Sequence, residues 1–464
     1  MSRVLPKGLT MRALLLVGAE SVLIVGSVGI AAYIRLGEWM WTVMIEEHGF
    51  LKSLLIASTC QLCLYYNDLY DFRKIVDRRD LFVRIAQALA AASFILAVIY
   101  FWFPATMIGR GVFFIAAILV ISLIVGWRVA FEWLALQLGP RERLLLVGTG
   151  AAAIKLAREI FERRHELGVE IVGFIDADPA KVGEPVINPG VIGTIDDISS
   201  IVRSRAVDRV VVSLAEARGK LPMDKLLDMK LQGVSFDHLA SVYEEYTGKI
   251  AVENLRPSWL IFSSGFQGMH ALRAAKRAMD ILLAIGGLVI LSPIMLAIAA
   301  LVRLTSAGPA LYHQARVGHR GRVFMVHKFR SMRADAEAET GPVWAKSGDT
   351  RVTPIGAFLR KSRLDELPQL WNVLVGDMSF VGPRPERPEF VEELTGEIPF
   401  YGQRHAVRPG LTGWAQVRYS YGASREDALE KLQYELFYIK NMSLALDAFI
   451  ILKTIKTVVL RRGT

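Results

Sequence analysis

Long apolar runs separated by short polar stretches dominate the first part of the chain. Four of them cover residues 13–34, 51–66, 81–103 and 111–136. Each approaches the roughly 20 residues that an α-helix needs to cross a bilayer. Polar residues within the first two runs, Glu20 among them, mean that the pattern does not define the ends of these runs sharply. The pattern predicts a region of four transmembrane helices over residues 1–138.

Basic residues between the runs predict which ends face the cytoplasm, because Lys and Arg are enriched in short cytoplasmic loops. The connection between the third and fourth runs holds Arg110 alone, and two further arginines follow the fourth run. The stretch between the second and third runs holds four basic residues, Arg73, Lys74, Arg78 and Arg79. The N-terminus, the 67–80 loop and all residues after about 140 are therefore expected in the cytoplasm.

A fifth apolar run, residues 281–302, differs from the others because Ser292 and Pro293 interrupt its centre. Proline removes a backbone donor and clashes with the preceding turn, while a serine hydroxyl can satisfy a freed carbonyl. Basic residues flank the run on both sides, which favours both ends on the cytoplasmic face. We expect a broken, re-entrant helix over residues 278–303 that enters one leaflet and returns. A proline-kinked helix that spans the membrane is the alternative.

The residues after the fourth run alternate between strand-like and helix-like patterns. An apolar stretch over 143–147 enters a glycine loop, and residues 151–164 have helical character. Further apolar strands are expected over 170–178, where the strand ends in carboxylates, and over 207–213. This order predicts a Rossmann-like, doubly wound α/β domain over residues 139–270.

The glycine loop raises the question of a bound dinucleotide. Gly148-x-Gly150-x-x-Ala153 fits a degenerate dinucleotide fingerprint, and Asp176 or Asp178 lies near the expected ribose position. Tight strand-to-helix turns also need glycine for steric reasons alone. We expect a structural or regulatory domain, and bound NAD is the alternative.

Composition adds a class of partner. The 464 residues are 53% hydrophobic, with mean hydropathy +0.35 and a net charge of +10. A basic chain can bind nucleic acid, but basic loops beside long apolar runs suit an anionic lipid surface better. We expect contact with membrane lipid and not with nucleic acid. The tail over residues 443–462 mixes apolar and basic positions, which predicts an amphipathic helix on the membrane surface or against the core.

An acidic pair set among basic residues marks the last part of the chain. Asp365 and Glu366 follow Lys328 and Arg330, and Arg384 comes after them. Carboxylates can hold a divalent cation or attack phosphorus, and cations neutralise the charge that moves in phosphoryl transfer. The cluster predicts a phosphoryl-transfer site that acts on a phosphorylated substrate at a membrane surface.

Five motifs in this part of the chain carry a resemblance to a known family. They are Gln314-x-Arg316-x-Gly318, Lys328-Phe-Arg-Ser-Met332, Asp365-Glu-Leu-Pro-Gln-Leu-Trp-Asn372, Gly382-Pro-Arg-Pro385 and Arg408-Pro-Gly-Leu-Thr-Gly-Trp-Ala-Gln416. Residues 274–464 thereby resemble the bacterial sugar transferase family of polyprenyl-phosphate hexose-1-phosphate transferases, also called monotopic phosphoglycosyl transferases. The regions before them resemble its large form, known for undecaprenyl-phosphate glucose or galactose phosphotransferases. A mostly helical catalytic domain over residues 271–464 is expected.

The resemblance implies a reaction, partners and a location. A UDP-sugar and undecaprenyl phosphate would give undecaprenyl-diphosphate-sugar and UMP, with Mg²⁺ required. This would be the first membrane step of exopolysaccharide, capsule or O-antigen synthesis. The protein would be a multi-pass protein of the bacterial inner membrane, with its Rossmann-like and catalytic domains in the cytoplasm. A homodimer and polysaccharide-assembly partners are also expected, whereas the motifs do not identify the hexose.

The family's roles carry over to the acidic pair. Asp365 would be the nucleophile that forms a covalent aspartyl-phosphosugar, and Glu366 the Mg²⁺ partner, with both carboxylates as candidate metal ligands. If Asp365 is a helix N-cap, Pro368 falls in the first turn, and the pair lies at a positive helix terminus. A plain cap, or a capping box from Ser362 to Asp365, is the structural alternative.

The other motif residues are candidates for binding. Lys328, Arg330 and Arg384 are expected to contact substrate phosphates, and Ser292-Pro293 matches the helix-break motif of the family. A glycine-rich turn with an aromatic side chain suits either nucleotide contact or a packed corner, and its candidate residues are Arg408, Thr412, Gly413, Trp414 and Gln416.

Two other function classes fit parts of the sequence. A membrane-bound, NAD-dependent enzyme that modifies nucleotide sugars would use the middle domain. Such short-chain enzymes need Tyr-x-x-x-Lys downstream of the glycine loop, whereas Tyr70-x-x-x-Lys74 lies upstream. A non-catalytic scaffold for polysaccharide assembly would not need Asp365 and Glu366 among cations. The sequence favours the transferase.

Overall fold

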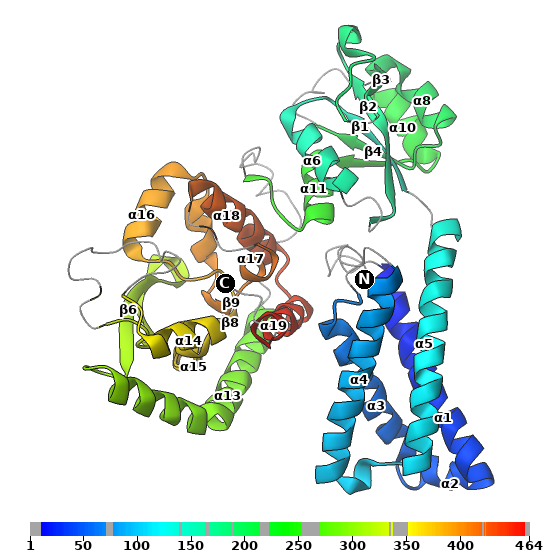
Figure 1. The fold of residues 1–464 in the computed structure, drawn as a ribbon. Helices are drawn as coiled ribbons and strands as arrows, with labels where there is room; N and C mark the ends of the chain where they lie inside the picture. The colour runs from blue at the N-terminus through cyan, green and yellow to red at the C-terminus, as the bar shows by residue number, and fades with distance from the viewer. Residues whose placement is uncertain are drawn as a thin grey trace. The chain divides into compact units, whose positions relative to one another are not determined.

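The chain divides into two compact units, with the boundary between residues 239 and 240. Figure 1 shows the helices and strands of both units. The computed structural model describes residues 11–70, 78–138, 142–162, 167–187, 189–213, 222–252, 270–333, 336, 351–419, 422 and 424–459. The first unit holds the N-terminal helices and a parallel sheet, and the second holds the acidic pair.

Four long helices pack into a bundle at the start of the first unit. They are α1 (Met11–Leu36), α3 (Gly49–Tyr66), α4 (Arg78–Trp102) and α5 (Arg110–Leu138), with η1 (Gly37–Trp39), α2 (Met40–Ile45) and η2 (Pro104–Thr106) between them. Their inner faces share one apolar core. Large apolar side chains on the outer faces are exposed, as a lipid-facing surface requires.

Among the described residues, four helical stretches are long and apolar enough to cross a membrane, which makes this a membrane protein. Three lie in the bundle, and the fourth lies in the second unit: Leu15–Ile45, Leu81–Trp102, Arg110–Phe131 and Ala271–Thr305. The predicted run over 51–66 forms α3 and packs in the bundle, but it is not among the four. Residues 71–77 of the predicted cytoplasmic loop, Lys74 included, lie outside the described residues.

Glu20 is tolerated in an apolar helix because it is paired inside the bundle. The Arg128 Nε lies 2.6 Å from Glu20 Oε1, and Arg128 Nη1 donates to the carbonyl of Leu69 at 2.7 Å. The Tyr70 hydroxyl donates to the other Glu20 oxygen. These contacts join α1 and α5 to the residues just after α3, and they pair charges that would be costly in lipid.

The middle region forms the predicted doubly wound sheet. Five parallel strands are ordered β3-β2-β1-β4-β5. They are β1 (Glu142–Val147), β2 (Val169–Asp176), β3 (Val191–Thr194), β4 (Arg209–Val212) and β5 (Ser235–His238). The accompanying helices are α6 (Ala151–Glu162), η3 (Pro179–Lys181), η4 (Ile195–Asp197), α8 (Ile198–Ser204) and α10 (Met223–Leu231). The predicted fold of this region is confirmed.

The end of β2 is occupied by contacts within the chain. Asp176 accepts hydrogen bonds from the Thr149 hydroxyl at 2.5 Å and from Lys181 Nζ at 3.2 Å. Thr149 lies in the glycine loop, where Gly148 has φ +99° and so needs to be glycine. The carboxylate expected near a ribose is thus bonded to its own loop, and bound NAD stays an untested prediction.

The second unit begins earlier than the boundary predicted at residue 270. α11 (Leu239–Thr247) and the residues after it pack into the second unit, where Ile250 and Val252 are part of its core. Lys440 Nζ binds Glu244 Oε2 at 2.6 Å. The sequence missed this because the segment follows the sheet directly and carries no break in composition.

The second unit is mostly helical, as expected. Its strands are β6 (Leu311–Val317) and β7 (Val323–Phe329), an antiparallel hairpin, and β8 (Ser379–Val381) and β9 (Gly410–Thr412), a parallel pair. Its other elements are α13 (His270–Thr305), η6 (His319–Gly321), α14 (Pro354–Ser362), η7 (Leu364–Glu366), α15 (Gln369–Val375), α16 (Pro388–Glu397), η8 (Tyr401–Ala406), α17 (Trp414–Arg418), α18 (Arg425–Lys440) and α19 (Leu444–Val459).

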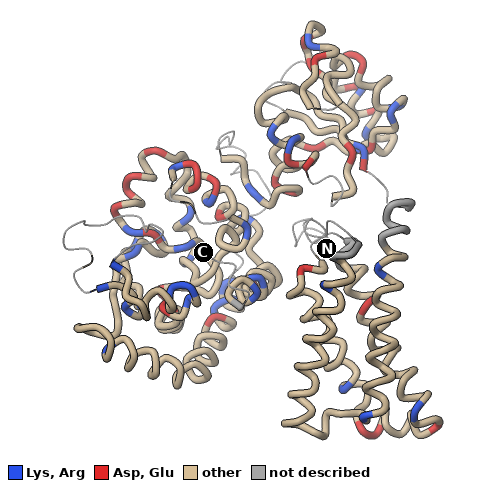
Figure 2. Tube along the Cα trace, in the orientation of Figure 1, with Lys and Arg blue, Asp and Glu red and all other residues tan. Residues whose placement is uncertain are grey.

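The predicted helix break is a bend within one continuous helix. α13 runs through Pro293, and Figure 1 shows its two halves pointing in different directions. The carbonyl of Val289 loses its backbone partner because Pro293 has no N–H, and the Ser292 hydroxyl donates to it at 2.8 Å. Figure 2 shows the middle of this helix free of charged residues.

Both ends of α13 are fixed to the same unit. Near its start, Arg277 donates to the carbonyls of Val373 and Leu374 at 2.6 and 2.7 Å. Just past its end, the carbonyls of Ser306 and Ala307 accept from Arg330. A straight helix of 36 residues would place its two ends about 54 Å apart, so the bend at Pro293 brings the two attachment points closer together.

The C-terminal helix packs on the core, as one of the two predictions for the tail has it, and its contact with a membrane surface stays a prediction. Leu446 and Ile450 of α19 are fully buried in the core, whereas Leu452 and Ile455 are exposed. The helix therefore packs on the unit and also presents an apolar face. Residues 460–462 of the predicted tail lie outside the described residues.

Candidate active site

Asp365 and Glu366 lie together in one short 3-10 turn, η7, between α14 and α15. Arg363 ends α14 with φ +56° and so turns the chain into η7. The expected N-cap role of Asp365 is wrong, because α15 begins only at Gln369, after Pro368. No capping box involves Ser362, whose hydroxyl donates to the carbonyl of Phe358 at 2.8 Å.

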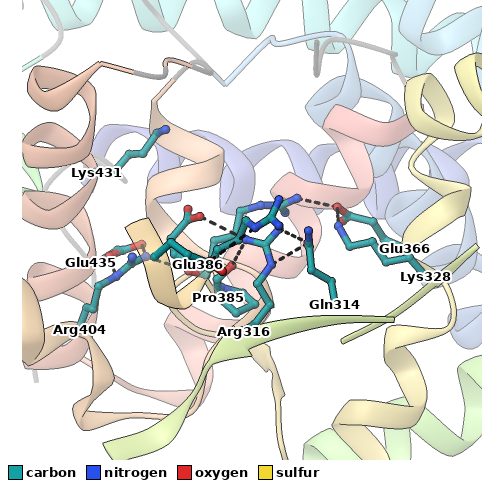
Figure 3. A network of polar contacts seen from close by, with 12 residues as sticks. Gln314, Arg316, Lys328, Glu366, Pro385, Glu386, Arg404, Lys431 and Glu435 are labelled. Atoms are coloured by element: carbon teal, nitrogen blue, oxygen red, sulfur yellow. Dashed lines mark hydrogen bonds and ion pairs between the residues drawn. The ribbon is translucent and has the colours of Figure 1, made fainter. Parts of the chain in front are cut away.

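Glu366 is held by two cations that come from distant parts of the chain. Arg384 Nη2 lies 2.7 Å and Lys328 Nζ 3.4 Å from Glu366 Oε1 (Figure 3). Lys328 is on β7, and Arg384 follows β8. Asp365 and Glu366 are each only 9% exposed, so these charges interact with little screening by water. The structure thus brings together four of the residues that the sequence singled out.

The pKa values of the two carboxyl groups are shifted in opposite directions. Burial raises the pKa of Glu366, but Arg384 and Lys328 outweigh burial and hold that pKa well below its usual range. Burial and then the charge of Glu366 raise the pKa of Asp365 to about 6. Burial also lowers the pKa of Lys328, and Glu366 opposes this change. Glu366 is therefore ionised at neutral pH, while Asp365 loses its proton close to neutrality.

A row of polar side chains on the β6–β7 hairpin borders the pair. Tyr312 pairs with Lys328 and Gln314 with Val326, so alternate residues of β6 share the face that carries Lys328. Arg316 donates to the carbonyl of Pro385 at 3.0 Å and to Gln314 Oε1 at 2.6 Å. Sequence reasoning did not name Gln314 and Arg316 as site residues, although this alternation could have found them.

Arg330, predicted to contact a substrate phosphate, instead binds residues just after α13. Its guanidinium is buried and donates to the carbonyls of Ala307 and Ser306 at 2.6 and 2.9 Å. Basic side chains often bind the free carbonyls at a helix C-terminus. Arg330 thus fixes the end of α13, and the expected phosphate contact is not favoured.

The glycine-rich turn is a packed corner. Trp414 is 1% exposed, its indole N–H donates to the carbonyl of Gly248 at 2.9 Å, and its ring stacks on Phe437. The Thr412 hydroxyl pairs with that of Thr454 at 2.6 Å. A Cβ atom at Gly413 would lie only 2.3 Å from the carbonyl oxygen of Gly382, in the loop after β8. Of the two expectations for this turn, packing is favoured over nucleotide contact.

The two remaining candidates in this turn are placed differently. Gln416 lies in the short helix α17, and its Oε1 is buried without a hydrogen-bond partner among the described residues. Arg408 lies before β9 and near His319, where burial and then the charges of Arg320 and Arg408 lower the histidine pKa. Arg408 is therefore on the side of the hairpin turn and stays a candidate for nucleotide contact.

The acidic pair fits a magnesium ion only together with a substrate. Mg²⁺ usually takes one or two carboxylates, with phosphate oxygens and water completing six ligands. Among the described residues, no group of three or more His, Cys, Asp and Glu side chains could hold a metal. Asp365 and Glu366 are adjacent and can supply the protein's share. The requirement for Mg²⁺ stays a prediction.

Comparison with known proteins gives two matching families. The family described as bacterial sugar transferase matches residues 271–461, and the one described as CoA-binding domain matches residues 66–223. The first match contains the bent helix, the hairpin and the acidic pair. The second overlaps the parallel sheet.

Several curated relatives are similar to this chain. A UDP-N-acetylgalactosamine-undecaprenyl-phosphate N-acetylgalactosaminephosphotransferase of Aeromonas hydrophila is 45% identical over 48% of this chain and 51% of its own length. UDP-glucose:undecaprenyl-phosphate glucose-1-phosphate transferases of Xanthomonas campestris pv. campestris and Escherichia coli (strain K12) are 36% and 33% identical. They align over 68% and 71% of this chain and over 66% and 70% of their own lengths.

Proposed function

Since the chain belongs to the bacterial sugar transferase family, we propose that it transfers a hexose-1-phosphate from a UDP-sugar to undecaprenyl phosphate. The family and the transferase class predicted from the five motifs are confirmed by these relatives. The observation that supports this reaction most directly is the buried pair of Asp365 and Glu366, in which Arg384 and Lys328 bind Glu366. The products would be undecaprenyl-diphosphate-sugar and UMP.

The reaction proceeds in two displacements at phosphorus, because two phosphate anions repel each other in a direct attack. In the first, an oxygen of Asp365 bonds to the sugar-bearing phosphorus, the bond from that phosphorus to the bridging oxygen breaks, and UMP leaves with that oxygen. In the second, an oxygen of the lipid phosphate attacks the same phosphorus, and the Asp365 carboxylate is released. A pKa of about 6 leaves Asp365 largely ionised at neutral pH, as the first step requires.

The neighbouring charges support these displacements. Glu366 keeps Lys328 and Arg384 beside the nucleophile, so cations are in place where the phosphoryl group must pass. A bound Mg²⁺ would neutralise charge on the diphosphate, held by Asp365 and Glu366 as the protein's ligands. The remaining polar face of the hairpin, with Gln314 and Arg316, borders the same space.

The bent helix supports a reaction at the membrane surface. Leu282, Ile290 and Leu296 of α13 are each more than 70% exposed, which is costly in water and favourable in lipid. Because both ends of α13 bind the unit that holds Asp365, we propose that the helix enters one leaflet and returns. The catalytic unit and the sheet domain would then lie in the cytoplasm, at the bacterial inner membrane. A homodimer and assembly partners stay predictions.

The relatives suggest which donors to test. The Aeromonas relative at 45% identity is named for N-acetylgalactosamine, whereas those at 36% and 33% are named for glucose. The purified protein in detergent or nanodiscs, with Mg²⁺ and undecaprenyl phosphate, should release UMP with one of these UDP-sugars. Asp365→Asn should release none while it keeps the melting profile of a folded protein. UMP release by both proteins would contradict the role of Asp365, and release by neither would contradict the proposed reaction.

A further inference from the structure

The loop that carries Arg384 is anchored by hydrogen bonds to four successive carbonyls. Those of Pro383 and Glu386 accept from the backbone N–H groups of Gly410 and Val317, at 2.8 and 2.9 Å. The carbonyl of Pro385 accepts from Arg316 at 3.0 Å. Each bond fixes one peptide group, so the loop has little freedom to rotate.

The remaining carbonyl, that of Arg384 itself, is bound by a buried side chain. Arg404 Nη2 donates to it at 2.8 Å, and Arg404 is only 4% exposed. The same guanidinium bonds Glu435 through Nε at 2.9 Å and Nη2 at 2.8 Å (Figure 3). It also bonds the Tyr401 hydroxyl through Nη1 at 2.6 Å. Arg404 thus connects α18 to the loop after β8.

The geometry of this connection favours a role beyond folding. A planar guanidinium bonded on both sides of its fork cannot turn without losing several bonds at once. Its position therefore fixes the peptide group of Arg384. The side chain of that residue reaches Glu366 at 2.7 Å, and Glu366 neighbours the nucleophile. Small displacements of a charge at such a place change rates strongly.

We infer that Arg404 and Glu435 are positioning residues of the transferase: they hold the backbone of Arg384 so that its guanidinium stays on Glu366 during phosphoryl transfer. This inference rests on the proposed function, because it assigns a task within that reaction. Neither residue touches the acidic pair, so each acts through Arg384. The sequence gives no local sign of the pair, since 31 positions separate the two residues.

The test separates positioning from folding with the double variant Arg404→Met/Glu435→Leu. Apolar residues of similar size often replace a buried ion pair without loss of stability. We expect this variant to fold with a melting temperature near that of the wild type, while kcat for UMP release falls about 10²-fold at a nearly unchanged KM. A folded double variant with wild-type kcat would overturn the inference.

A matched control removes another buried ion pair from the same helix. Lys440 and Glu244 join α18 to α11, whereas Arg404 joins α18 to the loop of Arg384. Lys440→Met/Glu244→Leu should therefore keep the wild-type kcat. An equal loss of kcat in both double variants would mean that any buried pair serves the fold equally, and it would also overturn the inference.

A milder variant guards against a failure to fold. Glu435→Gln keeps the shape of the side chain and weakens its hold on Arg404, and we expect a lower kcat at a nearly unchanged KM from it in folded protein. Wild-type kcat in folded Glu435→Gln would contradict the inference. Inactive wild-type protein would instead contradict the proposed function.

Discussion

Ser292 donates its hydroxyl hydrogen to the carbonyl oxygen of Val289 at 2.8 Å, in place of the N–H that Pro293 lacks. A carbonyl oxygen without a hydrogen bond is energetically unfavourable in lipid, so a proline without a compensating donor would destabilise a membrane helix. The serine supplies the missing donor within the same turn. The two residues together allow α13 to bend while its exposed surface stays apolar.

Replacement of Pro293 by alanine should straighten α13 and impair transfer. Alanine restores the N–H to the carbonyl of Val289, which removes the reason for the bend. The two anchors at Arg277 and Arg330 then compete with a straight helix, so we expect at least a tenfold loss of UMP release, on the order of 1.4 kcal/mol. Ser292→Ala, which keeps the proline, should be closer to wild type in activity.

Thiol labelling of the same helix tests its course through the membrane. In a background without Cys60 and Cys63, single cysteines at Arg273 and Arg303 should react with a membrane-impermeant reagent from the same side. Reaction from opposite sides would contradict the re-entrant course and favour a spanning helix.

The activity should depend on pH through Asp365. Its carboxylate is the attacking form, and burial with the charge of Glu366 raises its pKa to about 6. The kcat for UMP release should therefore fall as pH drops through about 6, and not near the ordinary value of 3.8. Glu366→Gln removes the repelling charge, so its residual activity should show the acid limb at lower pH. An acid limb that does not move in this variant would contradict the coupling.

Asp365→Asn should raise stability while it removes activity. A carboxyl group whose pKa rises on folding from 3.8 to about 6 costs stability wherever it is ionised in the folded protein. The cost is absent below a pH of about 4, appears between about 4 and 6, and reaches roughly 3 kcal/mol above that. The variant should melt higher than wild type near pH 8 and together with it near pH 4. A lower melting temperature of the variant at the higher pH would contradict this account.

Arg330 and Arg384 should differ in what their loss does. Arg330 holds the carbonyls at the end of α13, so Arg330→Gln should lower the melting temperature by the equivalent of about 2–3 kcal/mol. Arg384 reaches Glu366 on a loop that is otherwise fixed, so Arg384→Gln should cost about 10²-fold in kcat. Thermal unfolding and UMP release measured on both variants would decide. An unchanged melting temperature together with a large loss of kcat in Arg330→Gln would contradict the assignment of Arg330 to the fold.

Much of the fold and the core of the site could be predicted from the sequence, because both depend on local patterns. Apolar runs gave the bundle, and the alternation of apolar strands with helices gave the parallel sheet. The acidic pair was found because Asp365 and Glu366 are adjacent in the chain. Ser292 and Pro293 were found for the same reason, as neighbours in one apolar run.

The rest depends on where side chains point, which a motif does not state. Arg330 is two residues from Lys328, yet it faces the end of α13 while Lys328 faces Glu366. Trp414 lies in a motif that suits nucleotide contact, but its indole is buried on the carbonyl of Gly248. The pair of Arg404 and Glu435 comes from distant elements, so only the folded chain brings it together.

The most direct test of the central claim is the covalent step on Asp365. Protein incubated with Mg²⁺ and a UDP-sugar labelled in its sugar-linked phosphate, without lipid acceptor, should take up label and release UMP in a single burst. Undecaprenyl phosphate added afterwards should remove the label, and Asp365→Asn should never acquire it. UMP release that occurs only when the lipid is present, from protein that never carries label, would contradict the account.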